Sequence, residues 1–301
     1  MKLAAIDIGS NAARLLISDA TVVETQKPDF VKLTLVRVPL RLGFDVFENG
    51  KISEQKGDKL LKTIQSYKLL LDVYEVNHLI TAATSAMRGA ENSKEILSKV
   101  YNETGININV ISGEEEATFI YENHIADNMN EDESYLYIDV GGGSTELTFF
   151  SDGRLVAKRS FDIGTIRLLK NQVTEEHWGE MKNFIKQSTS GYHHISAIGS
   201  GGNINKVFSL SKRKEGKPLP LELLRNYYKE FSSISLTQRT RLYHLREDRA
   251  DVIVPALLIY INVMRWADTE EIFVPKIGLA DGLIHILYDK VKKSAGSAVI
   301  R

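Results

Sequence analysis

Two short apolar runs with a glycine and serine loop between them open the chain, and the same pattern returns in its second half. The two copies lie at residues 3–17 and 135–150, and their polar loops run from Asp7 to Asn11 and from Asp139 to Ser144. The second aspartate follows the first by 132 residues. Each copy therefore predicts two strands joined by a tight turn.

The repeat continues downstream of both loops. Each half has a third strand-like run, a helical period of apolar residues, a strand ending in small residues, and a strand that meets a glycine and an acidic residue before a helix. These segments are 31–38, 53–74, 79–88 and 109–123 in the first half, and 155–161, 175–188, 195–203 and 272–290 in the second. We predict an α/β protein with two copies of β-β-β-α-β-α-β-α, each a mixed sheet flanked by helices.

An acidic, asparagine-containing stretch near 123–134 marks the boundary between the copies. We predict an N-terminal domain at 1–123 and a C-terminal domain at 124–301. The second copy is longer because it contains an extra helical segment at about 219–265, in which Pro220 is a plausible helix start.

The composition excludes several classes of protein. Of the 301 residues, 43% are hydrophobic and 26% are charged, which is typical of a folded globular chain and not of a disordered or collagen-like one. The chain has no cysteine, so disulfides, thiolate nucleophiles and iron–sulfur ligation are excluded. Any catalysis must use oxygen, imidazole or amine groups.

The net charge of −1 argues against nucleic acid or a membrane surface as the partner, because such proteins usually have a basic excess. The longest apolar stretch, 252–264, is too short to span a membrane. Asp7 falls inside what would be the apolar core of a signal peptide. We expect a cytoplasmic protein that binds an anion locally, and the sequence leaves its oligomeric state open, with a homodimer as one option.

The two glycine loops are candidate phosphate-binding sites. They consist of Gly9, Ser10 and Asn11 in the first copy and Gly141, Gly142, Gly143 and Ser144 in the second. Glycine after a strand lets backbone N–H groups converge on an anion. A single loop of this kind is equally well explained as a hairpin turn, but two at equivalent positions favour the ligand. Neither loop matches the P-loop or the dinucleotide-binding pattern.

An aspartate precedes each loop. Asp7 and Asp139 are placed to hold a hard cation, or to cap the turn by accepting backbone N–H bonds. Ser144 and Glu146 are two residues apart on a predicted strand and share a face, so Glu146 can join Asp139 around one magnesium ion. The candidate metal ligands are therefore Asp139, Glu146 and Asp7, and the choice between Mg²⁺ and Mn²⁺ stays open.

Three consecutive glutamates follow Ser112 and Gly113 at the start of a predicted helix. Ser112 and Glu115 fit a capping box, and the helix dipole explains Glu114. Successive helical residues diverge by about 100°, so Glu116 points away from both. It is either solvated or a general base aimed into a cleft between the two halves.

Arg88 follows a strand end rich in threonine and serine, on the side of an open α/β sheet where ligands usually bind. It is a candidate clamp for phosphate oxygens, although a lone arginine at a helix start is more often a surface residue. The turn containing Gly199, Gly201 and Gly202 occupies the equivalent place in the second half. Its glycines would admit a nucleotide or another part of a substrate.

These motifs, in this order and spacing, resemble the exopolyphosphatase/guanosine pentaphosphate phosphatase family. The resemblance covers essentially the whole chain, and its most specific part is the Gly-Gly-Gly-Ser-Thr-Glu segment at 141–146. It implies the fold of actin-like ATPases and sugar kinases, with two ribonuclease-H-like domains that close on a phosphate-filled cleft. Ala12 departs from the pattern, because many relatives have a serine there. The helical extension of longer members would follow residue 301, and we expect a two-domain enzyme without it.

The resemblance also implies residue roles. Glu116 would be the base that activates water, Asp139 and Glu146 the carboxylates on the magnesium side, and Arg88 a phosphate ligand. The two glycine loops would bind phosphate.

We therefore expect an exopolyphosphatase that releases the terminal phosphate of inorganic polyphosphate. One alternative is the removal of a phosphate from guanosine pentaphosphate. Others are an ATP-binding protein of the actin or sugar-kinase type, for which the turn at Gly199 is the only hint, and a sensing module with an inactive site.

Overall fold

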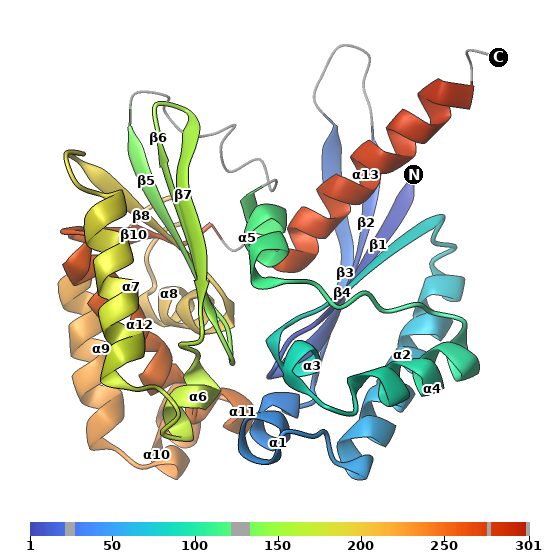
Figure 1. Ribbon diagram of the computed structural model, residues 1–301, viewed down its shortest axis with the longest axis horizontal. Coiled ribbons are helices and arrows are strands. Elements are labelled where there is room, and N and C mark those ends of the chain that lie inside the picture. The colour runs from blue at the N-terminus through green and yellow to red at the C-terminus, as the bar shows by residue number, and fades with distance from the viewer. Residues whose placement is uncertain (22–27, 122–132, 276–277, 299–301) are drawn as a thin grey trace. The chain divides into compact units, whose positions relative to one another are not determined.

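The computed structural model describes residues 1–21, 28–121, 133–275 and 278–298, and it has a mixed α/β fold with two separate sheets. The chain divides into two compact units. Unit 1 consists of Met1–Asn123 together with Leu279–Arg301, and unit 2 consists of His124–Gly278 (Figure 1).

The sheet of unit 1 has four strands in the order β3-β2-β1-β4. They are β1 (Lys2–Ile8), β2 (Ala12–Thr21), β3 (Asp29–Pro39) and β4 (His78–Ala83). β2 is antiparallel to β1 and to β3, whereas β4 is parallel to β1. Six consecutive residues of β1 are buried because helices pack against the sheet, and all of them except Asp7 are apolar.

Among the residues that the structure describes, six helices belong to unit 1. They are α1 (Leu42–Asn49), α2 (Glu54–Val73), α3 (Ser85–Gly89), α4 (Ser93–Thr104), α5 (Gly113–Tyr121) and α13 (Leu279–Ala298). The last of them corrects our domain boundary, since we placed all residues from 124 to 301 in the second domain. α13 lies across the first sheet and packs against β1, β2, β4 and α5 (Figure 1). Its apolar face, which includes Leu283 and Ile284, is buried there.

The sheet of unit 2 has six strands in the order β7-β6-β5-β8-β10-β9. They are β5 (Ser134–Val140), β6 (Thr145–Ser151), β7 (Arg154–Phe161), β8 (Ile195–Ser200), β9 (Leu219–Pro220) and β10 (Glu271–Phe273). The first four repeat the arrangement of unit 1, with an antiparallel meander followed by a parallel strand beside its first member.

The helices of unit 2 are α6 (Thr165–Leu169), α7 (Glu175–Ser188), α8 (Gly202–Ser211), α9 (Leu221–Ser233), α10 (Leu236–Tyr243), α11 (Glu247–Ala250) and α12 (Ile253–Trp266). Those from α9 to α12 occupy the predicted helical segment. α12 contains the longest apolar stretch except for its first residue, Val252, and belongs to the core. Pro255 lies in the first turn of α12, where proline is tolerated. Among the described residues, no helix is long and apolar enough to cross a bilayer.

The predicted strand near Asn109 is reduced to a single bridge between Val110 and Ala83. The hydroxyl of Thr81, on the neighbouring β4, donates to the carbonyl of Asn107 and accepts from the amide of Asn109. A side chain thus satisfies backbone groups that a strand would pair with its neighbour. The helix predicted after this segment is present as α5.

The repeat extends to the register of the strands. Asp7 lies opposite Arg14 in the antiparallel pair of β1 and β2, and Asp139 lies opposite Glu146 in the pair of β5 and β6. In both units the aspartate thus faces a residue seven positions later in the chain. The position opposite the aspartate is thus the same in both sheets, but it holds a positive side chain, Arg14, in unit 1 and a negative one, Glu146, in unit 2.

Candidate active site

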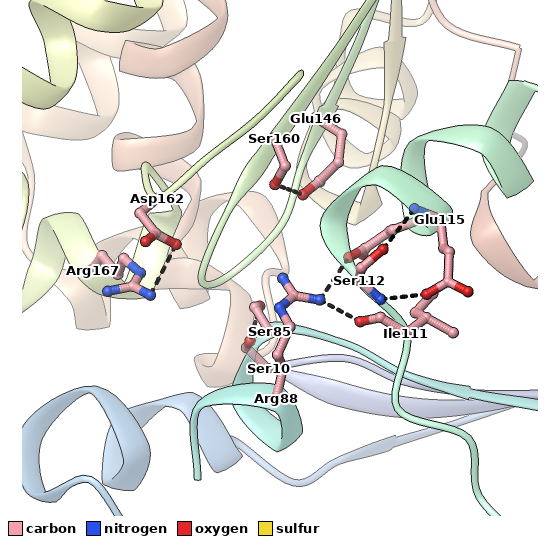
Figure 2. Close-up of polar contacts among 11 residues, drawn as sticks. Ser10, Ser85, Arg88, Ile111, Ser112, Glu115, Glu146, Ser160, Asp162 and Arg167 are labelled. Atoms are coloured by element: carbon pink, nitrogen blue, oxygen red, sulfur yellow. Dashed lines mark hydrogen bonds and ion pairs between the residues drawn. The ribbon is translucent and has the colours of Figure 1, made fainter. Parts of the chain in front are cut away.

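The loop from Gly141 to Ser144 is a tight turn whose carbonyl groups are all engaged. The amide of Gly141 donates to the carbonyl of Ser144 at 2.9 Å and closes the turn. The carbonyls of Gly141 and Gly142 accept from amides at the start of α6, at 3.0 and 2.8 Å. Nε of Arg167 donates to the carbonyl of Gly143 at 2.8 Å, and its Nη2 also holds Asp162 (Figure 2). The oxygens that would repel an anion therefore already have donors.

The loop of unit 1 is built in the same way. The amide of Gly9 closes the turn on the carbonyl of Ala12 at 3.0 Å. The carbonyls of Ser10 and Asn11 accept from the amides of Gly43 and Arg41, which lie where α1 begins. The turn-closing hydrogen bond and the backbone bond to the carbonyl of Ser10 or Gly142 recur in both units, so the two loops have the same turn, as the sequence repeat predicted.

Amide groups of the unit 2 loop are available as donors. Among the described residues, the N–H groups of Gly142, Gly143 and Ser144 donate to no partner. Backbone N–H groups with no protein acceptor, gathered in one turn, form the kind of concave donor site that binds phosphate. The geometry is compatible with the predicted phosphate loop.

Gly164 packs against the backbone of the loop at Gly141 to Ser144. A Cβ atom placed on this residue would lie 2.4 Å from the carbonyl oxygen of Gly142 and 2.4 Å from the carbonyl carbon of Gly143. The backbone of Gly164 therefore lies directly against the loop. The hydroxyl of Thr145, the first residue of β6, donates to the carbonyl of Ile163 and so links β6 to the segment just before Gly164.

Two carboxylates project from one face of the unit 2 sheet. Asp139 and Glu146 are direct partners on adjacent antiparallel strands, so their side chains leave the sheet on the same side. Glu146 is only 2% exposed, and its Oε1 accepts from the hydroxyl of Ser160 on β7 at 2.8 Å (Figure 2). Within the described part of the chain, no three acidic or histidine side chains gather as a metal cluster.

Tyr260 lies beside this pair. Burial, and after it the charge of Asp139, raises the pKa of Tyr260 well above its usual value, so the hydroxyl stays protonated. It donates to the carbonyl of Ser200, the residue that lies opposite Asp139 on β8. A buried tyrosine thus anchors the strand end next to the two carboxylates.

Asp7 has a different environment from Asp139. Its carboxylate is 2% exposed, and Oδ2 accepts from Nη1 of Arg14 at 2.6 Å. We expected Asp7 to be a metal ligand, but the opposite position on β2 places a guanidinium on it where Asp139 has a second carboxylate. A cation already pairs with this aspartate, which makes it a poorer ligand for a second one.

Glu116 is buried while its two acidic neighbours are exposed. Its exposed fraction is 8%, and the side chains of Glu114 and Glu115 face solvent. Glu115 and Ser112 form the predicted capping box: the amide of Ser112 donates to Glu115 at 2.8 Å, and its hydroxyl accepts from the amide of Glu115. The hydrogen bond from the backbone amide of Ser112 to the carboxylate lowers the pKa of Glu115. The different orientation predicted for Glu116 is therefore correct.

Arg88 faces Glu116 within unit 1. Its Nη1 lies 3.9 Å from Oε2 of Glu116 and donates to the carbonyl of Ile111 at 2.6 Å (Figure 2). The carbonyl holds the guanidinium in place, whereas the distance to Glu116 is too long for a hydrogen bond. The side chain of Arg88 is 32% exposed, so it is partly accessible to an anion.

The glycine turn of unit 2 has a packing explanation. A Cβ on Gly199 would lie 2.7 Å from Ile272, and one on Gly202 would lie 2.9 Å from the guanidinium of Arg249. Gly201 has a φ of +116° and approaches the carbonyl of Val140. The φ of Gly201 therefore explains this glycine without reference to a nucleotide or substrate, whereas the atoms close to Gly199 and Gly202 are the ends of flexible side chains.

Sequence reasoning did not single out Ser160, Arg167 or Gly164. Their roles depend on contacts of the loop or of the following strand β6 with segments 14 to 24 residues further along the chain. One signal was present for Ser160, because extending the predicted strand repeat to the third strand aligns it with Glu146. No sequence pattern marked Gly164, since a single glycine after a strand is common.

Comparisons with known proteins agree on one family. A family model described as the Ppx/GppA phosphatase family matches residues 21–293. The chain is 26% identical over 310 aligned residues to exopolyphosphatase 1 of Mycobacterium tuberculosis. This alignment covers 94% of this chain and 87% of that protein. It is 31% identical over 232 residues to a bifunctional 3-dehydroquinate synthase/phosphatase of Fusobacterium nucleatum. That match covers 70% of this chain but only 34% of the longer relative.

Solved structures have the same fold. An exopolyphosphatase from Cytophaga hutchinsonii aligns with a TM-score of 0.80 at 24% identity, over 97% of this chain and 98% of that one. The PPX-GPPA enzyme of Aquifex aeolicus aligns with a TM-score of 0.72 at 25% identity, over 95% and 99% of the two chains.

Proposed function

The chain belongs to the Ppx/GppA phosphatase family of hydrolases, and we propose that it releases the terminal phosphate of inorganic polyphosphate by attack of water. Similarity to a relative named as an exopolyphosphatase, over most of both chains, supports this substrate. One observation within the chain carries the proposal. Of three consecutive glutamates, only Glu116 is buried, and it faces an arginine that is itself partly accessible.

The proposed mechanism follows from the charge of the substrate. A terminal phosphoryl group leaves through a loose transition state, so positioning it and neutralising its oxygens supply most of the catalysis. The amides of the two loops and the guanidinium of Arg88 would bind these oxygens. Glu116 would accept a proton from the attacking water through one of its carboxylate oxygens.

Asp139 and Glu146 suit a magnesium ion. Carboxylate oxygens are the ligands that this hard cation prefers, and two carboxylates on one face of the sheet would repel each other without a cation. We propose that this pair holds Mg²⁺ or Mn²⁺, which when bound supplies positive charge near the phosphate oxygens. We leave Asp7 out of the ligand set because Arg14 already pairs with it.

A phosphate-release assay tests the substrate and the metal together. We expect phosphate from short and long polyphosphate with Mg²⁺, and loss of nearly all release after the metal is removed by a chelator. Mn²⁺ or Mg²⁺ added back should restore it, because the carboxylate pair offers the same oxygens to either ion. Full activity in metal-free protein would contradict the metal assignment.

Guanosine pentaphosphate is the rival substrate, and the same assay distinguishes it. Equal concentrations of polyphosphate and guanosine pentaphosphate should be compared by kcat/KM. A higher value for the nucleotide would replace polyphosphate as the proposed substrate. Release from neither, with phosphate transfer from ATP to a sugar instead, would contradict the hydrolase mechanism.

Ser160 should affect metal binding through Glu146. Replacing Ser160 by Ala removes the donor from Oε1 of Glu146, so the carboxylate loses part of what orients it. Loss of such a supporting hydrogen bond typically weakens metal affinity by about tenfold to a hundredfold. Calorimetric titration with Mn²⁺ measures this directly. Ser160→Thr keeps the hydroxyl and should retain the affinity, and an Ala variant with unchanged affinity would remove Ser160 from the site.

A further inference from the structure

A serine of the unit 1 loop, Ser10, shares a hydrogen bond with Ser85, and neither hydroxyl has a role in the mechanism proposed above. Oγ of Ser10 lies 2.8 Å from Oγ of Ser85, the first residue of α3 (Figure 2). The two residues are 75 positions apart in the chain, and their exposed fractions are 3% and 7%. This is a buried, long-range hydrogen bond between the candidate phosphate loop and the segment that contains Arg88.

The number of hydroxyl protons limits which hydrogen bonds Ser10 and Ser85 can donate. Each hydroxyl has one proton to donate, and it can also accept. When two serines share a hydrogen bond, one proton lies between them and the other is left to donate elsewhere. An ionised phosphate oxygen can only accept. If a phosphate oxygen bonds to the hydroxyl of Ser10, that hydroxyl must donate to the phosphate and must therefore accept from Ser85.

The pair also connects two parts of the candidate site in unit 1. α3 begins at Ser85, and Arg88 lies one turn later, where the carbonyl of Ile111 and the carboxylate of Glu116 face it. Ser10 lies in the loop between β1 and β2, and its carbonyl accepts from the start of α1. One hydrogen bond between side chains therefore ties the loop to the helix that bears the arginine.

We propose that Ser85 is a positioning residue: it donates to Ser10 and thereby fixes Ser10 Oγ as a hydrogen-bond donor to a phosphate oxygen of the substrate. The inference rests on the proposed function, in which the loop at Gly9 to Asn11 binds phosphate. It adds the direction of the Ser85–Ser10 hydrogen bond and a residue outside the loop. The equivalent loop of unit 2 has Gly142 where unit 1 has Ser10, so the hydrogen bond between Ser10 and Ser85 has no counterpart in that loop.

A double-mutant cycle tests the proposal. The variants are Ser10→Ala, Ser85→Ala and the double variant, and the readout is the dissociation constant for tripolyphosphate, measured by calorimetry. We expect each single variant to weaken binding by about tenfold, the size of one hydrogen bond to a charged group. The double variant should bind no more weakly than Ser10→Ala, because Ser85 acts through Ser10. Ser85→Thr, which keeps the hydroxyl, should bind close to the wild type.

Unit 2 offers a matched control. Oγ of Ser134 and Oγ of Ser151 lie 2.9 Å apart, and both residues are buried at 6% exposure. Ser134 begins β5 and Ser151 ends β6, so this pair lies at the opposite end of the strands from the loop at Gly141. The same cycle on this pair should lower thermal stability in a similar way and leave tripolyphosphate binding unchanged.

The outcomes separate this inference from the proposed function. Wild-type affinity in Ser85→Ala would overturn the inference, and so would additive losses in the cycle. Equal effects of both serine pairs on binding would show a general loss of structure and would also overturn it. A wild type that binds tripolyphosphate without hydrolysing it contradicts the proposed function, while the binding cycle still tests Ser85. A wild type that does not bind it overturns both.

Discussion

Replacing Glu116 by Gln is expected to lower phosphate release by roughly 10²–10⁴-fold, the range that a general base contributes. The substitution preserves the shape of the side chain and removes only its negative charge and its basicity. Glu116 is buried on α5 and faces Arg88, so no other glutamate of that helix can take its place. The measurement is kcat for tripolyphosphate at saturating concentration.

Substrate binding should survive in the same variant. A carboxylate near the phosphate site repels the substrate, so its replacement by a neutral amide should leave the dissociation constant for tripolyphosphate unchanged or lower. Loss of kcat with retained binding identifies a group that acts in the transition state. Parallel losses of binding and turnover would instead indicate a disturbed site.

Glu114→Gln is the control for this substitution. It changes the net charge by the same amount on the same helix, two residues away, but its side chain is exposed. We expect wild-type kcat for Glu114→Gln, because the structure shows Glu114 only as an acidic residue in the first turn of α5. Wild-type turnover in Glu116→Gln, or an equal loss in both variants, would remove Glu116 from the proposed mechanism.

The sequence was sufficient for the repeat and for the orientation of Glu116. Equal spacing of two similar patterns predicts equivalent strands, and the structure has them in the same register around Asp7 and Asp139. The orientation of Glu116 follows from helical geometry together with the capping box at Ser112 and Glu115. Both predictions depend on local rules, which act over a few residues and so are visible in a sequence.

Contacts over long distances were not predictable in the same way. The pattern of α13 shows that the helix buries one face, but it does not show that Leu283 and Ile284 are buried in unit 1. The role of Asp7 depends on the residue opposite it. The repeat, compared residue by residue, would have shown Arg14 in the position of Glu146 and would have predicted the ion pair.

Gly164→Ala is expected to have a large effect on activity, although it adds a single methyl group. The added Cβ would lie 2.4 Å from backbone atoms of Gly142 and Gly143, and backbone atoms cannot rotate away as a side chain can. The φ of Gly164 is −137°, which any residue adopts, so the effect is purely steric. Either the phosphate loop or the start of α6 must move.

A displacement of about 1 Å in a group that positions the substrate can cost roughly a hundredfold in rate, and overpacking costs about 1–3 kcal/mol of stability. We therefore expect kcat/KM for tripolyphosphate to fall by about a hundredfold, with a fall in melting temperature that leaves the protein folded at the assay temperature. Activity and thermal unfolding should be measured on the same preparation.

Gly179→Ala separates the steric effect from the general effect of replacing a glycine. Gly179 lies within α7 of the same unit, and a Cβ there meets no atom within 4 Å. Because alanine is favoured over glycine inside a helix by roughly 0.5–1 kcal/mol, this variant should be slightly more stable than the wild type and equally active. If Gly164→Ala also keeps wild-type kcat/KM, the loop at Gly141 to Ser144 tolerates displacement, and its amides are not the donors that position the phosphate.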